Sequence, residues 1–337
     1  MNPGWLHGMS SQLLLVAGVP ATQLDITLRS QAASSTGRLA WSSREEVVQW
    51  KPAETCIILV DVWDKHWCPT ATERLSALAM LMNQTLSAAR ELGVLIIHAP
   101  SDCMAFYVDY PQRKWVLELP NVTVPKDQPH AEPAFPLDAS DGGCDVPATS
   151  YQAWHRENRL ITIAQQDAIS AGQDGRQTSQ EIYNVLSARG IRNVLYAGVH
   201  ENMCIMTRPF AIKQLVAWDK FNVALIRELV DVMYNPMLSP YVSHAEGTTL
   251  MTEFIEKFWA PSMSMYDFLN PRKSGTAQEA QLSASAASDM KKQAEVAATL
   301  QRQTSPGKRT CEAGEQQGGE SLQCGSPDVH YTCPWQR

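Results

Sequence analysis

Short runs of apolar residues, separated by amphipathic stretches, set the pattern of this chain. The runs lie at 56–60, 94–98, 160–163, 193–199 and 222–229. Continuous apolar runs of this length are typical of strands that are buried on both faces of a parallel sheet. We therefore predict five core strands at these positions.

Helical spacing fills the intervals between the runs. It is clearest from Ala71 to Leu92, where apolar side chains recur every three or four residues until Gly93 ends the pattern. Further helices are predicted at 180–189, after residue 204, and at 244–259. Strands that alternate with helices predict an α/β fold, with a doubly wound, mostly parallel sheet and helices on both faces in a Rossmann-like three-layer arrangement.

The two ends of the chain differ in pattern from this central region. Residues 1–50 are predicted to form an N-terminal extension in which the alternating Leu24–Leu28 is an edge strand or hairpin arm. Residues 51–270 form the predicted domain, and the polar composition of 271–337 predicts a disordered tail. The apolar run Leu13–Val19 has no Lys or Arg ahead of it, unlike a signal peptide, so we expect a cytoplasmic protein, with secretion as the alternative.

Composition narrows the classes of partner. The chain has 337 residues, of which 44% are hydrophobic and 19% charged, and its net charge is −7. No basic run is present, which argues against a nucleic-acid partner, and no apolar stretch approaches the roughly 18 residues that span a bilayer. We expect a globular protein that binds a small molecule and forms a homo-oligomer.

The eight cysteines are scattered without a CxxC pair, which argues against a zinc ribbon or a thioredoxin-like site. A disulfide framework is not implied at this length, although the three cysteines in the tail, Cys311, Cys324 and Cys333, could pair. Cys204 differs from the others because it follows the strand at 193–199 and begins a helical pattern. Free N–H groups at a helix start favour a thiolate, the reactive form. A small buried core thiol is the alternative interpretation.

Polar residues follow three of the predicted strands. Asp61 ends the run at 56–60, His98 ends the next run, and Cys204 follows the fourth. The carboxyl ends of parallel strands lie side by side, so these side chains can converge. Acyl transfer fits the set: Cys204 would attack a carbonyl, Asp61 would accept its proton, and backbone N–H groups near His200 and Cys204 would bind the oxyanion. A helix cap or loop carboxylate is the alternative for Asp61.

The strand Ile57–Asp61, the strand Val94–His98 and the run Gly198-Val199-x-x-x-x-Cys204 resemble the isochorismatase-like cysteine hydrolases over about residues 53–260. The resemblance implies a doubly wound α/β fold, an Asp–Lys–Cys triad that hydrolyses small amides or related C–N bonds, and a cis peptide at Val199–His200. It assigns Asp61 as general base and Cys204 as nucleophile.

The chain departs from that family in two places. Asp61-Val62-Trp63 replaces the usual Asp-x-Gln, and the triad lysine that normally follows the third strand is missing, because Ala164–Asp167 holds no lysine. Lys65 and Lys114 are the candidates for the missing cation, with Lys114 preferred. A solvated surface lysine is the alternative for both.

Loop residues near the strand ends are candidates for substrate and metal binding. Aromatic residues could wall a pocket for a compact apolar group or could simply be core. The candidate substrate contacts are Trp63, His66, Trp67, Phe106, Tyr107 and His200. No cofactor is required by the proposed chemistry; a divalent metal held by His98 and Asp102, with His66, is an alternative. The acidic stretch Asp138–Asp145 lacks EF-hand spacing and is interpreted as a structured loop.

The sequence thus predicts a hydrolase that cleaves a C–N bond of a small amide or ureide through a thioester intermediate. A non-catalytic small-ligand binding protein that has lost the triad lysine is the alternative. An isochorismatase proper, which cleaves a vinyl ether without a cysteine nucleophile, fits less well because Cys204 is present.

Overall fold

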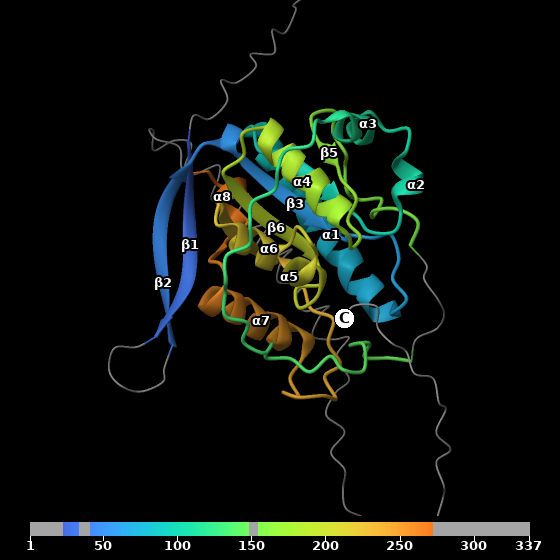
Figure 1. Cartoon of the computed structure of the whole chain (residues 1–337). Coiled ribbons are helices and arrows are strands. Elements are labelled where there is room, and N and C mark those ends of the chain that lie inside the picture. Colours follow the sequence, from blue (N-terminus) through green and yellow to red (C-terminus); the bar gives the residue numbers. More distant parts are fainter. Residues whose placement is uncertain (1–22, 34–40, 148–153, 272–337) are drawn as a thin grey trace, which may run out of the picture.

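The computed structural model of this chain describes residues 23–33, 41–147 and 154–271. One eight-stranded sheet runs through them in the order β2-β1-β8-β7-β6-β3-β4-β5 (Figure 1). The strands from β8 to β5 in this order are parallel to one another, while β1 and β2 are antiparallel to their neighbours. The strands are β1 (Leu24–Ala33), β2 (Trp41–Trp50), β3 (Thr55–Val60), β4 (Leu95–Ala99), β5 (Ala168–Ile169), β6 (Asn193–Val199), β7 (Asn222–Asp231) and β8 (Ser262–Met263).

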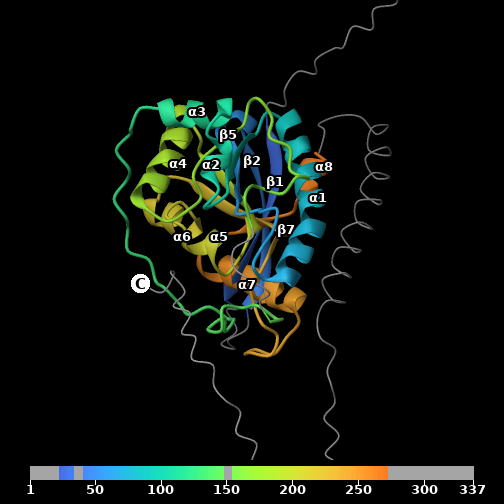
Figure 2. The same cartoon turned by 90° about the vertical axis from the view of Figure 1, so that its right-hand side faces the viewer.

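Helices cover both faces of this sheet (Figure 2). Along β3, Ile57 and Leu59 pack with α1 and α8, while Cys56, Ile58 and Val60 pack in the cluster that holds α4 to α7. This alternation follows from the period of two in a strand, and the predicted three-layer α/β class is confirmed. The helices are α1 (Pro69–Glu91), α2 (Met104–Tyr107), α3 (Pro111–Glu118), α4 (Arg176–Ala188), α5 (Cys204–Thr207), α6 (Ile212–Trp218), α7 (His244–Phe258) and α8 (Tyr266–Leu269), with the 3-10 turn η1 (Pro52–Glu54).

Four of the five predicted core strands are confirmed as β3, β4, β6 and β7. The strand predicted at 160–163 is wrong, because this segment forms a turn in which Ile161 N–H donates to the carbonyl of Asn158 and Leu160 is 47% exposed. The third core strand in chain order is the two-residue β5. The predicted helix after Cys204 is divided into α5 and α6 around Pro209, as expected of a proline beyond the first turn.

The N-terminal hairpin joins the sheet through β8. The predicted arm Leu24–Leu28 belongs to β1, which pairs along its length with β2 and meets β8 at Arg29 and Ser262. The apolar run Leu13–Val19 and the predicted tail with Cys311, Cys324 and Cys333 lie outside the described residues. No helix in the described part of the chain is long and apolar enough to span a membrane.

The central strands end together and so define one edge of the sheet. Val60 of β3 pairs with Ala99 of β4 and with Gly198 of β6, so the residues that follow these strands meet at this edge. Gly198 has a φ of 119°, and a Cβ atom there would lie 2.0 Å from the carbonyl oxygen of Val60. Only glycine permits this close approach of β6 to β3.

Candidate active site

Asp61 lies at the carboxyl end of β3 and is fully buried. Its φ of 50° is in the left-handed region, which Asp tolerates better than most residues. Ser101, which follows β4, donates its backbone N–H to Asp61 Oδ1 at 2.7 Å and its hydroxyl to the same oxygen. The β3–β4 pairing therefore fixes the direction of the Asp61 carboxylate.

Arg208 supplies the positive charge at this carboxylate. One terminal nitrogen, Nη2, donates to Asp61 Oδ2 at 3.1 Å and to Ser101 Oγ at 2.7 Å. The other, Nη1, lies 3.4 Å from Asp174 Oδ1, and the Arg208 side chain is 2% exposed. A guanidinium is always charged, so it balances a buried carboxylate that would otherwise be costly.

Cys204 begins α5 and its thiol forms a hydrogen bond with the Asp61 carboxylate. Burial raises the pKa of Cys204, and the charge of Asp61 raises it further. Burial also raises the pKa of Asp61, against the opposing effects of Arg208, Cys204 and Ser101. The expected helix-stabilised thiolate is thus not supported: α5 has four residues, and the thiol faces a carboxylate. At rest Cys204 is a protonated thiol beside a base.

The peptide bond between Val199 and His200 is cis, as the family resemblance implies. The backbone N–H of His200 lowers the pKa of the Cys204 thiol, against the larger opposing effect of burial. The N–H groups of Glu201 and Met203 already donate to the carbonyl oxygens of Asp231 and His200. The assignment of the oxyanion donors to His200 and Cys204 stays a prediction.

Neither predicted lysine is brought to Asp61. Lys114 is 54% exposed and pairs with Asp109 at 3.1 Å, and Lys65 is exposed. The cation in that place is Arg208, which sequence reasoning missed. A usable signal was present, since Arg208 follows Cys204 by four residues and so lies one helical turn away on the same face.

The position of the third core strand along the chain determines where the family lysine would lie. Because that strand is β5, the residue that follows it is Ser170 and not Ala164. The Ser170 hydroxyl and the Ala171 N–H both donate to Glu181. The chain therefore has no lysine at this position, and its cation comes from the end of α5 instead.

Four of the six predicted substrate-contact residues gather near the site. The His66 ring lies 5.0 Å from His200, 5.1 Å from Trp67 and 5.7 Å from Trp63, measured between ring centroids. Trp154, which was not predicted, stacks on Trp63 at 4.5 Å. Burial lowers the pKa of His66 to about 4, with a further contribution from Arg74, so the ring is neutral at pH 7.

Tyr107 packs in the same buried cluster as Trp63 and Trp154, and Phe106 packs on Tyr107; contact of either residue with a substrate stays a prediction. The Tyr107 hydroxyl accepts a hydrogen bond from the Glu157 backbone N–H, and the ring is buried. Phe106 is 39% exposed, with the Arg156 guanidinium 4.9 Å above its ring. Both aromatic residues therefore pack beside the loop at Arg156 and Glu157.

The predicted metal ligand His98 is fully engaged by carboxylates. Its Nδ1 lies 2.8 Å from Glu157 Oε2 and its Nε2 lies 3.1 Å from Asp167 Oδ2. Burial would lower the pKa of His98, but the charges and hydrogen bonds of Glu157 and Asp167 outweigh it and raise the pKa to about 9. A protonated imidazole offers no lone pair to a metal. Asp102 is exposed. Both ring nitrogens of His98 thus face carboxylates in this structure, and a metal at His98 and Asp102 stays a prediction.

This ion cluster predicts a pH-dependent stability. The folded-state pKa of His98 is raised, so its contribution is complete below about pH 6.5 and is lost as pH rises through about 9. At about 1.4 kcal/mol per unit, we expect a fall of about 3 kcal/mol in the free energy of unfolding over that range. Urea unfolding at a series of pH values measures it, and His98→Gln should flatten the slope. An equal slope in both proteins would contradict this assignment.

A disulfide that the sequence did not predict lies beside the aromatic residues. Cys68 and Cys144 are bonded and join the start of α1 to the loop 138–145. That loop is structured as expected, since Asp138 and Asp141 accept from the N–H groups of Ser140 and Gly143. Within the described ranges, the one cluster with metal-ligand spacing is formed by Cys68, Cys144 and Asp145, and its two sulfurs are bonded to each other.

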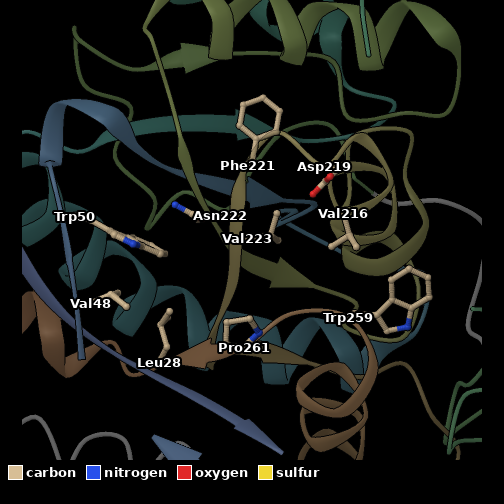
Figure 3. A pocket seen from close by; sticks show the side chains of 10 residues that line it. All are labelled: Leu28, Val48, Trp50, Val216, Asp219, Phe221, Asn222, Val223, Trp259 and Pro261. Carbon is tan, nitrogen blue, oxygen red and sulfur yellow. The ribbon is translucent and has the colours of Figure 1, made fainter. Parts of the chain in front are cut away.

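Two cavities lie at different edges of the sheet. One, of about 410 Å³, lies between the β1–β2 hairpin and the start of β7, where Trp50 points toward Asn222 and Val223 (Figure 3). It is at the amino ends of the parallel strands, away from Cys204. The other, of about 300 Å³, is lined by Met104, Arg113 and the segment 171–178, which includes Asp174. The ion pair of Asp174 with Arg208 connects this second cavity to the site.

The structure resembles solved α/β proteins. A cysteine hydrolase from Pseudomonas syringae pv. phaseolicola has 16% identity and a TM-score of 0.42, over 64% of this chain and 91% of that one. An isochorismatase family protein from Burkholderia thailandensis has 15% identity and a TM-score of 0.37, over 64% and 93%. A putative isochorismatase from Burkholderia xenovorans has 13% identity and a TM-score of 0.39, over 70% and 98%.

No protein-family model matches the chain, and no curated protein has significant sequence similarity to it. The TM-scores of these likenesses to solved structures all lie below 0.5.

Proposed function

We propose that this chain is a cysteine hydrolase that cleaves a C–N bond of a small amide or ureide. The observation that carries the proposal is the contact of one thiol, one carboxylate and one guanidinium in a buried site: Cys204, Asp61 and Arg208. A nucleophile beside a base, with the base oriented by further groups, is the arrangement that covalent acyl transfer requires.

The reaction begins with the transfer of the thiol proton to Asp61 as the Cys204 sulfur attacks the carbonyl carbon. Collapse of the tetrahedral intermediate breaks the C–N bond, and Asp61 returns the proton to the leaving nitrogen. Water then attacks the thioester with Asp61 again as base, and the C–S bond breaks to restore the thiol. While the Asp61 carboxylate is ionised, Arg208 balances its negative charge through Oδ2. Ser101 donates to Oδ1, the oxygen that Arg208 does not contact.

Trapping of the thioester tests this function directly. Wild-type protein is mixed with a panel of small primary amides and ureides, quenched in acid and digested. We expect a substrate of the right class to add its acyl mass to the peptide that contains Cys204. Low temperature slows deacylation and so favours the adduct. If a substrate is hydrolysed under these conditions and no such adduct is found, the thioester mechanism is contradicted.

A non-catalytic small-ligand binding protein is the rival function. It is favoured by the raised pKa of Cys204, which resembles that of an inert buried thiol. The same panel separates the two: a binding protein would retain a ligand reversibly, with no adduct at Cys204 and no released amine.

A further inference from the structure

Asp174 is a second carboxylate at the Arg208 guanidinium. Its Oδ1 lies 3.4 Å from Arg208 Nη1, while Arg208 Nη2 lies 3.1 Å from Asp61 Oδ2. The two carboxylates therefore share one cation through its two terminal nitrogens. They differ in environment, because Asp61 is fully buried and the Asp174 side chain is 45% exposed.

The segment that carries Asp174 is held in place by several contacts. At its start, Glu181 accepts from the Ser170 hydroxyl and from the Ala171 N–H, and Arg113 pairs with the same carboxylate. Gly172 packs so closely on β4 that a Cβ atom would lie 2.1 Å from the carbonyl oxygen of Ala99.

The chain turns directly after Asp174. Gly175 has a φ of 134°, which favours glycine, and it precedes α4. Asp174 is thus half-exposed, but the contacts on either side of it fix its backbone next to Arg208.

We propose that Asp174 is a positioning residue for the Cys204 site: it holds the second nitrogen of Arg208 and so limits how strongly Arg208 stabilises the charged form of Asp61. The inference rests on the proposed function, in which Asp61 must accept a proton from the thiol. A base that is bound too tightly by a cation is a weak base, because an opposite charge nearby favours the ionised carboxylate.

The titratable and charged groups around Asp61 come from three strand ends. Cys204 and Arg208 follow β6, Cys103 follows β4, and Asp174 follows β5 and acts through Arg208. Of these, Asp174 can be changed without removing an atom that contacts Asp61. Its loss removes the Asp174 carboxylate from Arg208 and keeps the bonds of Arg208 to Asp61 and Ser101.

The test is the rate at which iodoacetamide alkylates Cys204, followed by mass spectrometry from pH 4 to pH 9. With Asp61 as base, the wild-type rate falls at acid pH as Asp61 takes up a proton. Asp174→Asn should move this acid edge to lower pH by about 0.5–1 unit, so that the rate below the wild-type edge rises about three- to tenfold. Asp174→Glu, which keeps the carboxylate, should retain the wild-type edge.

Asp109→Asn is the matched control, because Asp109 is an exposed carboxylate whose cation is the surface residue Lys114. Should Asp174→Asn fold poorly, Asp174→Ser replaces it. If the acid edge of Asp174→Asn lies at the same pH as that of the Asp109→Asn control, or at higher pH, the inference is overturned and the proposed function is left intact. A wild-type protein whose Cys204 shows no acid edge overturns both.

Discussion

Cys204→Ala should lose hydrolytic turnover by a factor on the order of 10⁵ or more. The sulfur is the atom that forms the thioester in the proposed reaction, and no other described thiol hydrogen-bonds to Asp61. The fold should persist, because the change removes one atom from a half-buried position at the start of a four-residue helix. Steady-state release of amine from a confirmed substrate measures the loss.

Cys103→Ala is the control for this change. Cys103 is, like Cys204, a free cysteine near Asp61, but it is buried and its sulfur contacts the Pro100 carbonyl at 3.8 Å. It should keep turnover within a few-fold of wild type. Full activity in Cys204→Ala, or an equal loss in Cys103→Ala, would contradict the assignment of the nucleophile.

Asp61→Asn is expected to lower turnover about 10³-fold, within the range of a lost general base. Asparagine keeps the size of the side chain and suits the φ of 50°. Its amide oxygen can accept from Ser101, but its NH₂ group then faces Arg208 and cannot take up a thiol proton. The variant therefore removes the base while preserving the backbone.

Asp102→Asn is a matched control for the conformational part of that change. Asp102 also has a left-handed backbone, with a φ of 57°, near the end of a core strand, but it is exposed. Turnover in Asp102→Asn should stay near wild type. If Asp61→Asn retained wild-type turnover, Asp61 would not be the base.

The sheet was predictable because buried parallel strands are nearly continuous apolar runs. The runs at 56–60 and 193–199 are too short for typical buried helices and rich in β-branched or other apolar residues, which favours strands, and the residues after them include Asp61 and Cys204. The run at 160–163 was wrongly predicted to be a strand. Its backbone N–H groups donate to Asn158 and Asn83 instead of to a neighbouring strand, which the hydrophobic pattern alone does not show. The two-residue β5 is too short to produce a pattern.

The cation was missed because the contact between Arg208 and Asp61 joins residues 147 positions apart. Only the folded sheet edge brings the end of α5 to the end of β3. Lysine is also not the one residue type that suits this place, because a guanidinium can neutralise a carboxylate as an ammonium does. The Cys68–Cys144 disulfide was missed for the same reason, since its partners are 76 positions apart.

The proton transfer from Cys204 to Asp61 is the central claim, and the pH dependence of Cys204 alkylation in wild type and Asp61→Asn tests it most directly. With Asp61 as base, the wild-type rate should be nearly constant between the pKa of Asp61 and that of Cys204. In Asp61→Asn the rate should instead rise about tenfold per pH unit across the neutral range, as expected of an unassisted thiol. Two profiles that coincide would contradict the claim.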